Sequence, residues 1–328
     1  MTLPGIFDRL RLPVVGAPMF LVSSPELVIT QCTAGIVGSF PALNAREAEG
    51  APVELEHWLE RITQALAAHD RDHPDRPAAP YAVNLIVHRS NARLERDVEI
   101  LCRWRVPIWI TSLGARPEVF EAARASGALV LHDVTTDTFA RKAIAKGADG
   151  LIAVAAGAGG HAGAQSPFAL VSEIRAWFDG PLLLSGAIST GRALLAAQAA
   201  GADLGYIGSP FIATEEAAAP EPYKRMIVES GAEDIVTSAL FTGVSGNYLR
   251  PSIARAGMDP DALPADATQM DFGAGSAKPK AWKEVWGAGQ GIGAVRAVRP
   301  AAALVDELAR DYAQARAALA ATLARWPV

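Results

Sequence analysis

The sequence lacks the features that mark several common classes of protein. Its 328 residues include only two cysteines, Cys32 and Cys102. They are too few and too far apart for a disulfide framework or a zinc-binding motif, so we expect buried free thiols. No run reaches the about 18 uninterrupted apolar residues of a membrane span, and the N-terminus has no apolar stretch of signal-peptide length.

Positive charge is not in surplus either. Lys and Arg number 30 against 35 Asp and Glu, which gives a net charge of −5 and no basic surface for nucleic acid. Together these absences predict a soluble, cytoplasmic protein, a monomer or homodimer, that binds neither nucleic acid nor a membrane and acts on a small molecule.

Several well-known catalytic and nucleotide-binding motifs are also missing. There is no Walker lysine, and no G-x-G-x-x-G follows the first predicted strand. No G-x-S-x-G sequence is present, and neither cysteine lies in a plausible nucleophile loop. No combination of histidines and carboxylates has the spacing of metal ligands, so we expect no metal site.

What the chain does have is a repeated alternation of short apolar runs and helical patterns. Half of the residues are apolar and 20% are charged, which is enough for a sizeable core. Eight runs are apolar almost throughout, as strands of a parallel sheet covered on both faces must be. Eight such units, most of them followed by a helix, predict a (β/α)8 TIM barrel. The runs begin at residues 11, 36, 81, 106, 128, 150, 181 and 204.

The alternation stops after residue 214. The segment that follows is rich in Gly, Pro, Ala and Asp and has no strand rhythm. We therefore expect residues 215–279 to form an inserted, mainly helical lid subdomain, with 1–214 and 280–328 forming the barrel. The last predicted element, 300–326, is one long amphipathic helix that closes the barrel.

Polar and glycine residues gather at the ends of the predicted strands, where TIM barrels hold their active sites. The turns after the seventh and eighth strands contain Gly186, Gly208 and Ser209, and turns at these positions commonly hold a phosphate. Glycine lets the backbone approach an anion closely. The alternative is that both are merely tight turns between strand and helix.

The sixth strand is followed by "AAGAGGHAGAQS", residues 155–166. Its His161, flanked by glycines above the barrel mouth, is suited to removing a carbon-bound proton or to hydrogen bonding an anion. A solvated side chain is the alternative. His132 lies inside an apolar strand and is either a core residue or a site residue. Trp286 and Gln290 lie in "EVWGAGQGIGAV", 284–295, which either folds back over the mouth or links lid to barrel.

With these motifs in place, the chain resembles the nitronate monooxygenase family, formerly called 2-nitropropane dioxygenases, which are FMN-dependent barrels. The stretch "GAGGHAG" is similar to the family's E-A-G-G-H-x-G. The stretches "APM", "VNL", "SGAI", "GSPFIATEE" and "WGAGQG" match in order. The resemblance implies that FMN is the cofactor, that His161 is the catalytic histidine and that His132 and Trp286 lie near the substrate. The implied flavin contacts are Pro18, Met19, Asn84, Gly159, Gly186, Gly208, Ser209 and Gln290.

In such enzymes the flavin oxidises an alkyl nitronate, O2 is consumed, and a carbonyl compound and nitrite are formed. The chain departs from the family pattern at Gly157, where the motif has glutamate, and at Val154, where it has a polar residue. A nitronate's negative charge needs a donor or cation, for which His161, Tyr248, Lys278 and Lys280 are candidates.

Three other functions fit the same sequence. The first is an FMN-dependent NAD(P)H:quinone or enoyl reductase of the same fold. The second is a flavin-free lyase or isomerase acting on a phosphorylated substrate. The third is a flavin-binding protein without catalysis.

Overall fold

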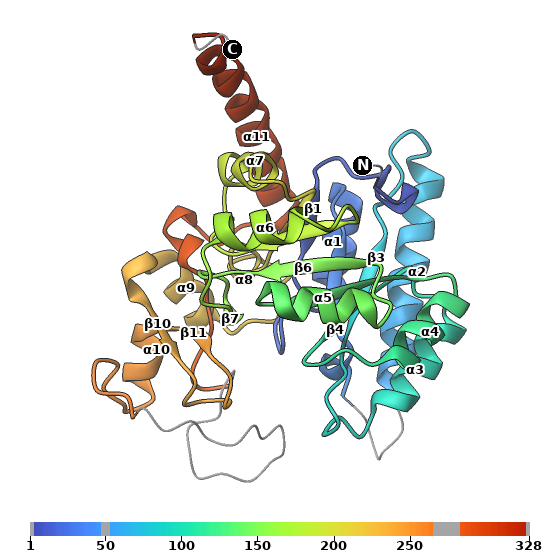
Figure 1. Ribbon diagram of the computed structural model, residues 1–328, viewed down its shortest axis with the longest axis horizontal. Helices are drawn as coiled ribbons and strands as arrows, with labels where there is room; N and C mark the ends of the chain where they lie inside the picture. Colours follow the sequence, from blue (N-terminus) through green and yellow to red (C-terminus); the bar gives the residue numbers. More distant parts are fainter. Residues whose placement is uncertain (1–2, 47–52, 265–282, 326–328) are drawn as a thin grey trace.

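The chain is built around eight parallel strands, seen in the computed structural model, which describes residues 3–46, 53–264 and 283–325 (Figure 1). Neighbours in the sheet follow the order β1-β9-β8-β6-β5-β4-β3-β2. A parallel bridge from Val15 in β1 to Val37, just before β2, closes the sheet into a barrel. The barrel strands are β1 (Val14–Gly16), β2 (Gly38–Pro41), β3 (Tyr81–Ile86), β4 (Ile108–Ser112), β5 (Leu129–Val134), β6 (Gly150–Val154), β8 (Leu182–Ser185) and β9 (Leu204–Ile207). Each coincides with one predicted apolar run, and the predicted TIM barrel is confirmed.

Helices between the strands cover the outside of the barrel (Figure 1). Their starts are encoded locally, since the hydroxyls of Ser24, Thr136 and Thr190 accept a backbone N–H three residues later. The covering helices are α1 (Pro25–Ala34), α2 (Val53–Asp72), α3 (Leu94–Arg103), α4 (Pro117–Ala125), α5 (Asp137–Ala145), α6 (Pro167–Arg175), α7 (Gly191–Ala199) and α8 (Ser209–Ile212). Short 3-10 turns are η1 (Gly5–Phe7), η2 (Ala42–Asn44), η3 (Ala232–Asp234) and η4 (Gln290–Ala294).

The last helix, α11 (Ala301–Leu323), packs its first half against α7 and α1, and its second half extends away from the barrel (Figure 1). The contact with α7 is close: a Cβ on Gly191 would lie 2.0 Å from the backbone nitrogen of Tyr312. Glycine at this position lets the two helices approach. None of the described helices is both long and apolar enough to cross a lipid bilayer.

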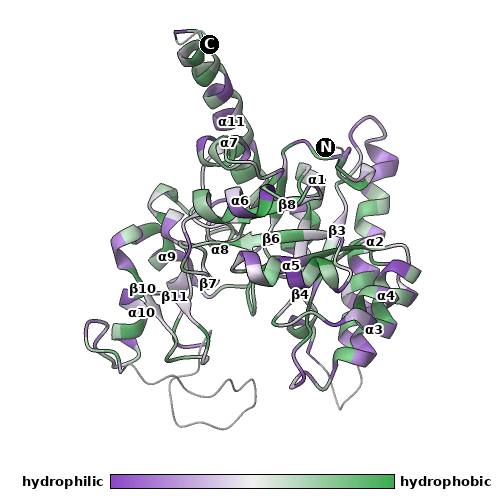
Figure 2. Cartoon of the chain, in the orientation of Figure 1, coloured by the Kyte–Doolittle hydropathy of each residue, from purple (hydrophilic) through white to green (hydrophobic). Residues whose placement is uncertain are grey.

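Alternate side chains of the strands face the inside of the barrel, because the side-chain period of a strand is two residues. Hydrophobic residues dominate the strands (Figure 2). The inner cluster includes Ala82 on β3, Ile110 on β4 and Leu131 on β5. The residues two positions further along these strands share that inward register. Polar side chains therefore face the interior at the C-terminal ends, namely Asn84, Ser112 and Asp133.

In its described residues, the segment between α8 and η4 contains two helices and a hairpin. The helices are α9 (Glu221–Glu229) and α10 (Arg250–Arg255), and the strands are β10 (Ile235–Ser238) and β11 (Gly246–Leu249). Strand β11 also pairs antiparallel with β7 (Gly160–His161), so the inserted segment is hydrogen bonded to the glycine loop. From the sequence we expected a mainly helical segment without strands, so the hairpin was not predicted. Strands of four residues are too short to produce a detectable alternation.

The domain boundaries 1–214, 215–279 and 280–328 stay a prediction. Residues 265–282, with the candidate anion-binding residues Lys278 and Lys280, lie outside the described part of the chain.

Candidate active site

A cavity opens at the C-terminal ends of β8 and β9. It holds about 250 Å³ of empty space, including the part open to solvent. Four chain segments meet there: the glycine loop after β6, the turn that follows β8, the turn that follows β9, and the start of η4. Of the predicted cofactor contacts, four line this one cavity: Gly159, Gly186, Gly208 and Ser209.

Backbone hydrogen bonds hold the glycine loop against its neighbours. The N–H of Gln290 donates to the carbonyl of Gly157 at 2.9 Å, and the N–H of Gly289 donates to Ser209 Oγ at 2.8 Å. A Cβ on Gly159 would lie only 2.8 Å from the nitrogen of Gly289. The glycines are therefore required by the close packing of these loops. That they also leave room for a ligand stays a prediction.

The cavity has the chemistry of an anion site. No carboxylate is among its lining residues, which are mostly glycine, alanine and serine. Gly208 is the N-cap of α8, so backbone N–H groups begin the helix beside the cavity. Ser209 accepts a hydrogen bond from Gly289 and its hydroxyl proton is available for donation to an oxyanion. A phosphate group fits these residues.

His161 lies in β7, where Gly246 of β11 is its register partner. Its Nε2 is 3.0 Å from Thr242 Oγ1 in the loop between β10 and β11. Burial lowers the pKa of His161 to about 4, so the imidazole is neutral at physiological pH. Burial raises the pKa of the nearby Tyr248 hydroxyl, while a hydrogen bond with Thr242 lowers it. Thr242 thus connects the histidine to the inserted segment.

A second polar group lies inside the barrel. Asn84 Nδ2 donates to Ser112 Oγ at 2.8 Å, and Ser112 Oγ donates to Asp133 Oδ2 at 2.5 Å. Burial raises the pKa of Asp133 to about 7, against a small lowering by the Ser112 hydrogen bond. Sequence reasoning named Asn84 as a flavin contact, noted Asp133 only as a polar residue at the end of the fifth strand, and missed Ser112. The inward register of a carboxylate at a strand's end is the signal that could have found Asp133.

Two further predicted contacts lie at the edge of the site. A Cβ on Gly208 would lie 3.6 Å from Met19 Sδ, so the end of β1 reaches the turn after β9. Pro18, the residue before Met19, is half-buried. The side chain of Gln290 is exposed, and its Oε1 would be 3.0 Å from a Cβ on Gly157. Gly157 has φ of 86°, a backbone conformation that disfavours the family's glutamate there.

His132 and Trp286 are not among the residues that line the cavity. His132 faces outward from β5: its Nδ1 is 2.7 Å from Thr111 Oγ1, and its ring lies 5.8 Å from that of Phe120 in α4. Trp286 is buried and stacks on Tyr223, with 4.7 Å between ring centroids. Both have the surroundings of core residues. Val154, at the end of β6, packs into the apolar inner cluster.

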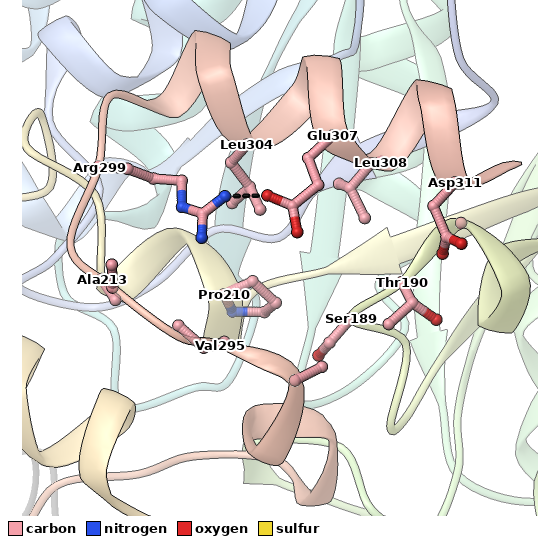
Figure 3. A pocket seen from close by; sticks show the side chains of 13 residues that line it. Ser189, Thr190, Pro210, Ala213, Val295, Arg299, Leu304, Glu307, Leu308 and Asp311 are labelled. Carbon is pink, nitrogen blue, oxygen red and sulfur yellow. Dashed lines mark hydrogen bonds and ion pairs between the residues drawn. The ribbon is translucent and has the colours of Figure 1, made fainter.

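A larger cavity lies between α8, α11 and the loop before α11 (Figure 3). Its polar side chains already serve the structure. Arg299 pairs with Glu307 (Figure 3), Asp311 accepts the N–H of Arg192 at 3.0 Å, and Thr190 caps α7. Within the described ranges, no group of three or more His, Cys, Asp or Glu side chains is placed to hold a metal ion.

Comparisons with known proteins agree with this arrangement. The family model described as nitronate monooxygenase matches residues 7–311. The nitronate monooxygenase of Paraburkholderia phytofirmans is 26% identical, over 92% of each chain. A hydroxy-octahydro-indene-carboxyl-CoA dehydrogenase of Rhodococcus jostii is 27% identical over 74% of this chain, and the match spans only 63% of that relative.

Two solved structures share the fold. The nitroalkane oxidase of Streptomyces ansochromogenes has a TM-score of 0.76 and 27% identity, covering 96% of this chain and all of that one. FabK of Thermotoga maritima has a TM-score of 0.75 over 98% of this chain and all of its own, but its 20% identity supports the fold alone.

Proposed function

The chain belongs to the nitronate monooxygenase family, and from this premise we propose that it is an FMN-dependent oxidoreductase of alkyl nitronates. Each nitronate would give a carbonyl compound and nitrite, and two nitronates would consume one O2, since each carbonyl gains one oxygen atom. One observation carries the proposal. The glycine loop lines the anion cavity with Gly159, and two positions later the same loop carries His161, which is not itself a lining residue and whose pKa burial lowers to about 4.

The cofactor would be held at both ends. Backbone N–H groups at Gly186, Gly208 and Ser209 would bind its phosphate, and Ser209 would add its hydroxyl. Pro18, Met19, Asn84 and Gln290 would contact the ring system. When bound, FMN supplies the redox chemistry that links the nitronate to O2.

His161 would act on neutral nitroalkanes as a base. Thr242 Oγ1 donates to the carbonyl of Val244 at 3.1 Å, so we assign the proton shared with Nε2 to the histidine. As a neutral imidazole, His161 would remove the proton α to the nitro group. A nitronate has already lost that proton, so its oxidation should depend less on the base. Tyr248, linked to Thr242, is a candidate donor to the nitronate oxygens.

The test is the visible spectrum of the purified protein without oxygen, before and after addition of ethyl nitronate, and separately of NADH. Loss of the oxidised-flavin bands with the nitronate alone supports the proposal. Bleaching only by NADH would place the chain among the reductases. Loss of the flavin bands only with a hydroxyacyl-CoA thioester would indicate that the protein is a dehydrogenase, as the relatives of that name are. A colourless protein that FMN does not reconstitute would overturn the proposal.

Paired variants test the two halves of the site. His161→Asn should retain FMN and lose most activity on nitroethane while retaining more on ethyl nitronate, whereas His57→Asn, on the exposed face of α2, should behave as the wild type. Gly208→Asp should lose FMN because it places a carboxylate beside the phosphate. Gly208→Ala is its control, since a Cβ there meets only Ala17 and Met19 at 3.3 Å or more.

A further inference from the structure

One buried polar atom has no function in the arrangement described so far. Oδ1 of Asp133 is shielded from solvent and, within the described ranges, has no hydrogen-bond partner. Buried polar atoms are nearly always hydrogen bonded, and leaving one without a partner has a cost of about 1–3 kcal/mol. Oδ2 of the same carboxyl, in contrast, accepts the Ser112 hydroxyl, which Asn84 orients in turn. A carboxyl so firmly held on one side indicates a ligand on the other.

The position of Asp133 in the barrel indicates which ligand. The anion cavity lies at β8 and β9, whereas Asn84, Ser112 and Asp133 lie on the adjacent strands β3, β4 and β5. In the closed eight-strand order, β3 and β4 lie opposite β8 and β9, and β5 is separated from β8 by β6 alone. Asp133 therefore lies on the barrel wall between the anion cavity and the opposite side, beside the mouth that a molecule anchored by its phosphate at β8 and β9 would cross.

Tyr206 is close both to the anion cavity and to Asp133. It lines the anion cavity, and burial followed by the charge of Asp133 raises its pKa well above the ordinary value. Tyr206 and Leu131, which shares the inward register of Asp133 on β5, belong to one inner cluster, so the carboxyl faces the interior that Tyr206 borders. Ile152 of β6, the register partner of Asp133, is apolar, and His132 of the same strand faces outward.

We propose that Asp133 is a positioning residue whose Oδ1 hydrogen bonds the polar pyrimidine edge of the bound flavin ring. This inference rests on the proposed function. Because the Ser112 hydroxyl donates to Oδ2, the proton of the neutral acid belongs on Oδ1 and is donated to a carbonyl oxygen or ring nitrogen of that edge. When the acid ionises, the same oxygen becomes an acceptor, so the charge beside the ring changes with pH.

The test uses the absorption spectrum of the flavin in the intact holoprotein. The isoalloxazine ring of oxidised FMN has no ionisation of its own near neutral pH, so a change in the ring's spectrum between about pH 5 and pH 9 reports a protein group beside the ring. We expect a difference spectrum with a midpoint near pH 7 in the wild type, because burial raises the pKa of Asp133 to about that value. His161→Asn should retain the change, and Asp133→Asn, which is isosteric, should abolish it.

A second variant keeps the inference testable if Asp133→Asn does not fold. Ser112→Ala removes the hydrogen bond that lowers the pKa of Asp133, so the midpoint should rise above that of the wild type. An unchanged midpoint in Ser112→Ala, a spectrum independent of pH in flavin-loaded wild type, or a change that persists in Asp133→Asn would each overturn the inference while leaving the proposed function intact. A wild type that binds no flavin would overturn both.

Discussion

Replacing Asp133 by Asn should change how the stability of the flavin-free protein depends on pH. The pKa of this carboxyl rises from 3.8 to about 7 in the folded protein because of burial. Above pH 3.8 the unfolded chain loses the proton, whereas the folded chain keeps it up to about pH 7. The unfolded state therefore binds fewer protons in this window, and the free energy of unfolding falls as the pH rises.

The size of the effect follows from the same pKa values. Each pKa unit corresponds to about 1.4 kcal/mol, so the full cost of holding the ionised carboxyl in the folded state is about 4 kcal/mol. This cost increases by about 2–3 kcal/mol between pH 5 and pH 8. In Asp133→Asn this cost is absent, so the variant should gain that amount of stability relative to the wild type as the pH is raised from 5 to 8.

Urea unfolding of the apoprotein at these two pH values measures the difference. Asp8→Asn, an exposed site, is the matched control and should show no such gain. If Asp133→Asn and the wild type differ by the same free energy at both pH values, the carboxyl is not held in its neutral form, and the burial argument is wrong.

Three further outcomes follow from the geometry. Because burial lowers the pKa of His161 to about 4, activity on nitroethane should stay constant from about pH 6 down to pH 5 and fall only as the pH passes through about 4; a decline centred near the ordinary histidine value would contradict this. Gly191→Ala should lower the free energy of unfolding by about 1–3 kcal/mol, since its Cβ would collide with the backbone of Tyr312, and a melting temperature within a degree of the wild type would refute the close helix contact. Glu307→Gln should alter stability by less than about 1 kcal/mol in urea unfolding, because the carboxylate that pairs with Arg299 is 50% exposed; a larger loss would show that this pair holds α11 in place.

The barrel could be predicted from the sequence because its strands are buried on both faces. Such strands are mostly apolar, and β3 and β4 are recognisable from their composition although each includes polar residues. The hairpin of β10 and β11 could not be predicted in this way. Its strands, "IVTS" and "GNYL", are short, and only β11 pairs with β7, which lies far away in the sequence.

The candidate site, like the fold, could be predicted only in part. Gly186, Gly208 and Ser209 were predictable because they follow strands whose ends must meet at one edge of the barrel. The environment of Asp133 was not predictable from the sequence, since its burial arises only when β3, β4 and β5 come together with the rest of the closed barrel. His132 next to it was singled out for its residue type, although the register turns it to the outer face.

The anion cavity is formed largely by main-chain atoms, and this has a consequence for how the chain can diverge. A peptide N–H is present whatever the side chain, provided the backbone keeps its path. Substitutions elsewhere in the loops can therefore accumulate without removing the groups that would hold a phosphate, whereas the hairpin beside His161 presents side chains such as Thr242 and Tyr248. Substitutions in the hairpin could thus change which electron donor a related protein oxidises, while the cavity stays the same.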